Sequence, residues 1–186
     1  PIYVSGSRIF GTTERTKQEV ITEIAAVLAF SAAQTGDKVG CIFFSDKVEK
    51  FIPPKKGRSH ILAIIRELVG FVPESNGTAI SEAVRYLTGV NKKRCTAFLL
   101  SDFLNSKRDD EALDDALKIA SARHDIIALK VSDPREREMP DVGIVELQDA
   151  ETARKVWVDT ASQAVRDHYA KRWAEREEKT RELLLH

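Results

Sequence analysis

The feature that most constrains the fold is the segment from Arg94 to Phe103, an apolar run that ends abruptly in Ser101 and Asp102. Residues 96–100 do not alternate between polar and apolar types, which predicts a strand buried on both faces, as in parallel sheets covered by helices. Ligands of such sheets bind at the carboxyl ends of the strands, so Asp102 is expected to lie at a functional edge.

The rest of the chain alternates between strand and helix patterns. This alternation predicts a three-layer α/β/α Rossmann-like fold with a mostly parallel central sheet. One antiparallel edge strand is expected at residues 47–52, and Pro53 and Pro54 are expected to end it because proline cannot donate to a sheet ladder. Thr160 and Gln163 fit a capping box at the start of the last helix. The other expected strands are residues 2–4, 38–44, 94–101, 125–131, 143–147 and 155–158.

Composition narrows the class of protein. The 186 residues include 29 basic and 29 acidic side chains, and this balance gives no reason to expect nucleic acid as a partner. The longest apolar stretch, Ile24–Ala33, falls short of the roughly 18 residues of a membrane span. Cys41 and Cys95 lie in strand-like runs and are expected to be reduced thiols, which favours a cytoplasmic location. We expect a single domain over residues 1–186, truncated at both ends because the first strand is short and the chain stops in an apolar run.

Hydroxyl and carboxylate side chains follow the predicted strands. Ser5 and Ser7 follow the first strand, Thr78 precedes a helix, and Asp102 follows the strand described above. These groups could meet at one switch point of the sheet, where hard oxygen ligands suit Mg²⁺ or Mn²⁺. Each also has a purely structural interpretation: Thr78 as a helix cap, Ser5 and Ser7 as turn residues, and Asp102 as a cap or a backbone acceptor.

The combination of motifs resembles a known family. The pattern Tyr3-x-Ser5-x-Ser7, Gly77-Thr78 and Ser101-Asp102 resembles the metal-ion-dependent adhesion site of von Willebrand factor A domains. The whole chain is closer to one branch, the bacterial domain of unknown function 58 family. Further matching pieces are Gly36-Asp37-Lys38-Val39-Gly40, Phe44-Ser45-Asp46, Pro53-Pro54-Lys55-Lys56-Gly57-Arg58 and Met139-Pro140-Asp141-Val142-Gly143.

The resemblance implies a protein-binding domain that works with a MoxR-type AAA+ ATPase, or with clients passed to it, in the assembly or maturation of other complexes. The family's first site residue is an aspartate, whereas this chain has Tyr3. A neutral phenol does not replace the missing negative charge, so Mg²⁺ or Mn²⁺ binding by Ser5, Ser7, Thr78 and Asp102 is expected to be weak or absent.

We expect no enzymatic activity, because the four histidines are scattered and no common catalytic motif is present. Two alternatives stay open. One is a Mg²⁺-dependent hydrolase that uses Asp102 as its metal-binding acid. The other is a metal-free scaffold, favoured if the ring of Tyr3 fills the site.

Overall fold

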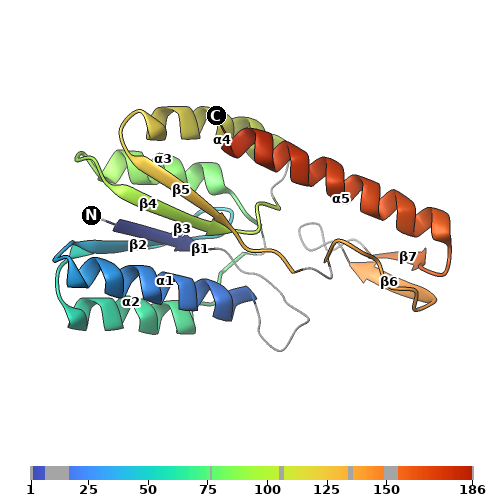
Figure 1. The fold of residues 1–186 in the computed structure, drawn as a ribbon, viewed down its shortest axis with the longest axis horizontal. Helices are drawn as coiled ribbons and strands as arrows, with labels where there is room; N and C mark the ends of the chain where they lie inside the picture. The colour runs from blue at the N-terminus through green and yellow to red at the C-terminus, as the bar shows by residue number, and fades with distance from the viewer. Residues whose placement is uncertain are drawn as a thin grey trace. The chain divides into compact units, whose positions relative to one another are not determined.

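The structure is a computed structural model that describes residues 2–6, 17–75, 77–104, 107–133, 136–148 and 155–185, with the backbone alone described for residues 2–6, 107, 108 and 148. The chain clusters into two compact units, residues 1–131 and 132–186 (Figure 1). The expectation of a single domain over residues 1–186 stays a prediction.

The first unit contains a five-stranded sheet with the strand order β3-β2-β1-β4-β5. β1 is parallel to β2 and to β4, and β4 is parallel to β5. β3 runs antiparallel to β2 at one edge. The expectation of a mixed α/β fold with parallel strands is therefore confirmed. The strands are β1 (Ile2–Gly6), β2 (Val39–Phe44), β3 (Val48–Lys55), β4 (Thr96–Ser101) and β5 (Asp125–Lys130).

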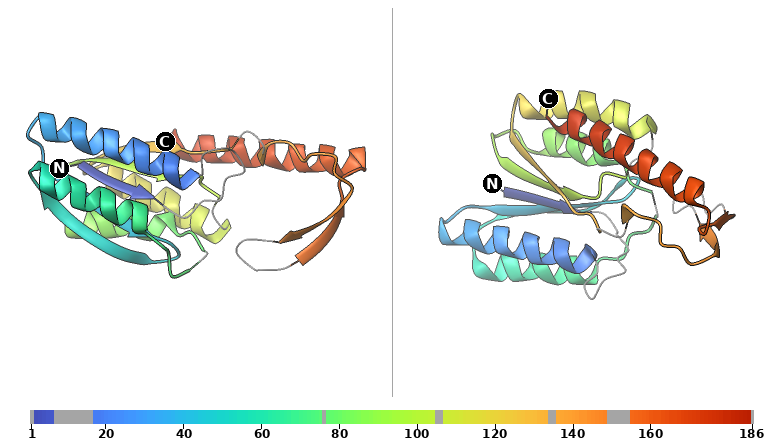
Figure 2. Two further views of the ribbon diagram at one scale, coloured as in Figure 1. Left: turned by 90° about the horizontal axis from the view of Figure 1, so that it is seen from below. Right: turned by 45° about the vertical axis from the view of Figure 1, so that its right-hand side comes forward.

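Four helices of the first unit lie against this sheet: α1 (Lys17–Gln34), α2 (Arg58–Gly70), α3 (Ile80–Val90) and α4 (Lys107–Ser121). α1 and α2 lie side by side on one face of the sheet, and α3 and α4 lie on the other, as both views show (Figures 1 and 2).

Every residue of β2 is buried, which follows from helices covering both faces of the sheet. Cys41 and Phe43 belong to the apolar cluster beneath α1 and α2. Ile42, which points the other way, lines a small cavity together with Val84 and Leu87 of α3. An uninterrupted apolar run is therefore the sequence pattern that this strand requires.

Helix α1 packs closely because its buried stripe consists mainly of small residues. Ile21, Ala25, Ala29 and Ala32 recur along one face and are buried. The helix ends at Gln34, and Gly36, two residues later, has φ 75°, a left-handed conformation that glycine adopts without strain. The amide N of Gly36 donates to Ala33 O (3.1 Å) and that of Asp37 to Ala32 O (2.9 Å), which is the Schellman pattern.

One correction concerns β3, which continues through Pro53 and Pro54 to Lys55. The prediction that the prolines end this strand was wrong. β3 lies at the edge of the sheet, where a proline nitrogen can face away from the ladder. The pairing is also irregular there: Lys55 opposes Val39 and Ile52 opposes Cys41, so an extra residue of β3 is accommodated.

The second unit contains an antiparallel pair, β6 (Ile144–Gln148) and β7 (Lys155–Asp159), followed by the helix α5 (Gln163–Leu184). The predicted capping box at Thr160 and Gln163 was wrong. The residue that precedes α5 is Ser162, and its side chain makes no capping hydrogen bond.

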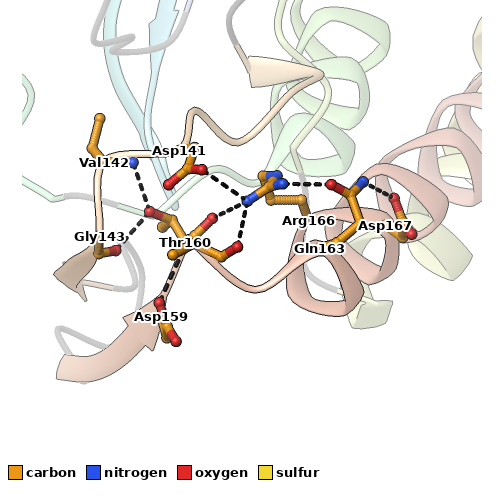
Figure 3. A network of polar contacts seen from close by, with 9 residues as sticks. Asp141, Val142, Gly143, Asp159, Thr160, Gln163, Arg166 and Asp167 are labelled. Carbon is orange, nitrogen blue, oxygen red and sulfur yellow. Dashed lines mark hydrogen bonds and ion pairs between the residues drawn. The ribbon is translucent and has the colours of Figure 1, made fainter.

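Thr160 instead joins β7 to the segment before β6 (Figure 3). Its Oγ1 donates to Gly143 O (2.6 Å) and accepts from Val142 N (3.0 Å). Arg166 of α5 donates to Thr160 O (2.5 Å) and pairs with Asp141 (3.6 Å). The start of α5 is thus held to the end of β7 by a hydrogen bond and to the segment before β6 by an ion pair.

Candidate functional site

The carboxyl ends of three neighbouring strands meet at one edge of the sheet. Gly6, the last residue of β1, pairs with Phe43 of β2 and with Leu100 of β4. Because β1 is parallel to both, the segments that follow the three strands leave in the same direction. We call this the carboxyl edge and define it by Gly6, Ser45–Asp46 and Ser101–Asp102. The strand order reverses between β1 and β4, so the edge includes the switch point of the sheet.

For β1 the structure describes the backbone alone, which gives the positions of Tyr3 and Ser5 along the strand. Tyr3 is the second residue of the strand, where it pairs with Gly40 and Ala97, and Ser5 lies one residue before the strand ends. Ser7 lies outside the described residues. Metal ligation by these serines therefore stays a prediction.

Thr78 lies beside the end of β2. The amide N of the following residue, Ala79, donates to Ser45 O at 2.7 Å, so the loop before α3 is attached to the carboxyl edge. A Cβ at Gly77 would come within 3.0 Å of the Cβ of Asp46, which is why this loop needs glycine at that position. The backbone thus brings Thr78 to the same edge as the end of β1 and Asp102.

Asp102 lies in a tight turn after β4. Leu104 N donates to its Oδ1 (3.2 Å), and Phe103 N donates to Ser101 Oγ (3.1 Å). Phe103 has φ 55°, a left-handed conformation that is unusual for an aromatic residue, and its side chain is buried. Asp102 thus accepts a backbone hydrogen bond, as its structural interpretation allowed, and its predicted role as a metal ligand stays a prediction.

Lys17 is a site residue that the sequence analysis missed. Its Nζ lies 3.7 Å from Asp102 Oδ2, and the side chains of Lys17 and Asp102 are 5% and 13% exposed. Lysine is rarely buried so completely unless its charge is paired. One sequence signal was available: Lys17 precedes Ile21 by four residues, so it continues the buried stripe of α1 toward the carboxyl edge.

Asp109 is a second residue that the sequence analysis missed. Its Oδ2 accepts from Ile80 N (3.0 Å), and its Oδ1 accepts from the Ser81 hydroxyl. Asp109 is buried, and it satisfies the amino end of α3 from the first turn of α4. The residue that precedes α3 is Ala79, so the structural interpretation of Thr78 as the cap of this helix does not hold, and Asp109 accepts the hydrogen bond from Ile80 N instead.

The thiol of Cys95 and the imidazole of His124 lie at the amino ends of β4 and β5, away from the carboxyl edge. His124 Nδ1 lies 3.4 Å from Cys95 Sγ, and both residues are buried. Burial raises the pKa of Cys95 and lowers that of His124, to which Arg123 also contributes. Cys41 is likewise buried, and burial raises its pKa. Cys41 and Cys95 are free thiols, as expected.

Comparison with known proteins decides the family. The chain matches the family described as "Protein of unknown function DUF58" over residues 2–179. It belongs to the DUF58 family. It is 30% identical over 175 residues to the uncharacterized protein Rv1480 of Mycobacterium tuberculosis and, equally, to the uncharacterized protein Mb1516 of Mycobacterium bovis. These alignments cover 90% of the chain and 52% of each relative, so the DUF58 chain spans about half the length of these relatives.

Two solved structures share the fold of this DUF58 chain. One is an aerotolerance-related membrane protein from Bacteroides fragilis, with a TM-score of 0.58, 15% identity and coverage of 100% of this chain and 96% of that one. The other is the conserved hypothetical protein BatB from Bacteroides thetaiotaomicron, with a TM-score of 0.60, 17% identity and coverage of 91% and 84%. Of the helices described in the present chain, none offers the length of apolar sequence that a membrane crossing requires.

Proposed function

We propose that this DUF58 chain is a non-enzymatic protein-interaction domain of the von Willebrand factor A-like class, with a three-layer α/β/α arrangement. Its interaction surface is the carboxyl edge, where Ser5, Ser7, Thr78 and Asp102 form a degenerate metal-ion-dependent adhesion site. Its partner is a MoxR-type AAA+ ATPase or a client passed to that ATPase during the assembly or maturation of protein complexes.

One observation carries this proposal: the strand that bears Ser5, the loop that bears Thr78 and the turn that bears Asp102 converge at the switch point of the sheet. Open α/β sheets bind their ligands at this position. Three segments distant in the sequence therefore meet at one edge of the sheet, which supports this edge as the place where another macromolecule is recognised.

The positions of the histidines favour binding over catalysis. His60 Nε2 is hydrogen-bonded to Val39 O (2.9 Å) at the first residue of β2, and His124 precedes β5. Both therefore lie at the edge opposite to the carboxyl edge. In the described part of the first unit, no histidine lies at the carboxyl edge to act as a general base there.

A binding measurement with matched threonine variants tests the proposal. Thr78 at the carboxyl edge and Thr96 at the start of β4 are both half-buried, and they lie at opposite ends of the sheet. Against the MoxR-type ATPase of the same organism, Thr78→Ala is expected to weaken binding about tenfold, whereas Thr96→Ala is expected to change it less than about twofold. Isothermal titration calorimetry with the complete protein measures both.

Two results would overturn this function. One is equal weakening by both variants, since the carboxyl edge would then have no special role. The other is Mg²⁺-dependent hydrolysis of a phosphoester such as p-nitrophenyl phosphate that is lost in Asp102→Ala, which would make the same edge the active site of a hydrolase.

A further inference from the structure

The ion pair between Lys17 and Asp102 bears directly on whether this edge needs a metal. Lys17 Nζ lies 3.7 Å from Asp102 Oδ2, and the Lys17 side chain is 5% exposed. The other oxygen of Asp102 accepts from Leu104 N (3.2 Å). Both oxygens of this carboxylate are therefore engaged, one by a backbone amide and the other by an ammonium group.

The contacts of Asp102 determine the net charge of the predicted metal site. Ser5, Ser7 and Thr78 are neutral, and Tyr3 replaces the aspartate of the adhesion-site pattern. Asp102 is the one carboxylate among the predicted ligands, and the ammonium of Lys17 balances its charge. Mg²⁺ and Mn²⁺ are normally held by anionic oxygens, so a divalent cation would gain little from this set and would be repelled by the ammonium.

Two neighbouring carboxylates, Asp46 and Asp109, already accept hydrogen bonds. Asp109 is engaged by Ile80 N and the Ser81 hydroxyl, and Asp46 accepts from the hydroxyl of Ser45 (3.1 Å). Over the part of the chain that the structure describes, no three carboxylate, imidazole or thiol groups gather closely enough to hold a metal ion. Over the described residues, the predicted ligands are therefore one paired carboxylate and neutral hydroxyls, a donor set that favours Mg²⁺ and Mn²⁺ poorly.

We propose that Lys17 is the resident cation of the carboxyl edge. Its ammonium occupies the electrostatic role that a divalent metal has in an adhesion site, and the edge recognises its partner without Mg²⁺ or Mn²⁺. This inference rests on the proposed function for its biological meaning, but the absence of metal binding can be measured without any partner.

The test is a calorimetric titration of MgCl₂ and of MnCl₂ into the wild-type protein, Tyr3→Asp, Lys17→Met and the double variant Tyr3→Asp/Lys17→Met. We expect no saturable binding by the wild type and binding by the double variant at least about tenfold tighter than by Tyr3→Asp alone.

Lys17→Arg keeps the positive charge and is expected to behave as the wild type. Lys50→Met, which breaks the exposed pair of Lys50 with Glu67, is the matched control and is expected to bind no metal.

Saturable wild-type binding of Mg²⁺ or Mn²⁺ would overturn the proposal, as would a double variant that binds no tighter than Tyr3→Asp. Should the Lys17→Met variants fail to fold, the wild type still decides the question. Saturable broadening of the amide signals of Leu104 and Ala79 by Mn²⁺ in an NMR spectrum contradicts the proposal, and unchanged signals support it. If the wild-type protein did not bind the MoxR-type ATPase, the proposed function would be contradicted. The result of the metal titrations would still stand, because they use no partner.

Discussion

The two compact units of this chain are stabilised by different interactions. In residues 1–131 the strand β2 is completely buried, and α1 and α2 close over an apolar cluster that includes Phe43 and Leu100. In residues 132–186 the helix α5 is described throughout and has no buried residue. Its attachment to β6 and β7 is the hydrogen-bond network around Thr160 (Figure 3).

The apolar side chains of the second unit show the same difference. Ile144 of β6 and Trp157 of β7 are each 69% exposed, whereas Phe43 and Leu100 of the first unit are almost completely buried. A two-stranded ribbon buries little apolar surface and is only marginally stable by itself. Burial therefore stabilises the first unit, whereas specific hydrogen bonds determine the local structure of the second.

Removing core volume from the first unit is expected to have the largest effect. Phe43→Ala deletes a fully buried ring that packs on Phe71 with the ring centroids 4.9 Å apart. We expect the free energy of unfolding of this unit to fall by about 3–5 kcal/mol. Urea denaturation measures this change. Val69→Ala, on the exposed face of α2, is the control and is expected to change it by less than about 0.5 kcal/mol. Equal effects of the two variants would show that the cluster around Phe43 does not dominate stability.

A smaller and more local effect is expected in the second unit. Thr160→Ala removes the acceptor of Val142 N and the donor to Gly143 O, which is expected to cost about 1–3 kcal/mol of local stability. Hydrogen exchange is expected to accelerate at the amides of Val142 and Thr160 and to stay unchanged in β2.

Thr180→Ala is the control for this change, since the Thr180 hydroxyl only donates to Arg176 O within the exposed part of α5. Faster exchange in β2 on replacement of Thr160 would show that the stability of the two units is coupled.

The smallest expected effect is a pH dependence that originates in the first unit. Burial lowers the pKa of His124 below its ordinary value of 6.5, and Arg123 lowers it further, against the opposing effect of Asp125. Below about pH 6.5 the unfolded chain therefore binds a proton that the folded protein does not. Stability is complete above that pH and falls as the pH decreases toward the lowered pKa of the folded state.

Thermal unfolding between pH 7 and pH 5 measures this dependence, and His124→Leu is expected to flatten it. Arg94 lowers the pKa of Asp125 through a hydrogen bond, so the contribution of that carboxylate is lost only in more acidic solution, below its ordinary value of 3.8. An unchanged slope in His124→Leu would exclude His124 as the group responsible.

Most elements of the fold could be predicted from local patterns, because burial imposes a regular spacing on apolar residues. The uninterrupted run of β4 and the stripe of α1 are examples. The errors came where tertiary context overrides local preference. Pro53 and Pro54 are tolerated because β3 lies at an edge, and Thr160 does not cap α5 because its hydroxyl bonds to Gly143 and Val142.

For the candidate site as well, some features could be predicted from local sequence patterns and others depend on tertiary packing. The sequence by itself determined that Thr78 and Asp102 stand next to a helix start and a strand end, because turn and strand patterns are local. Only the tertiary structure decided that Asp102 faces Lys17 and that Asp109 reaches the start of α3. Pairing of distant charged groups depends on how helices pack against the sheet, and a linear pattern of residues carries no direct record of that packing.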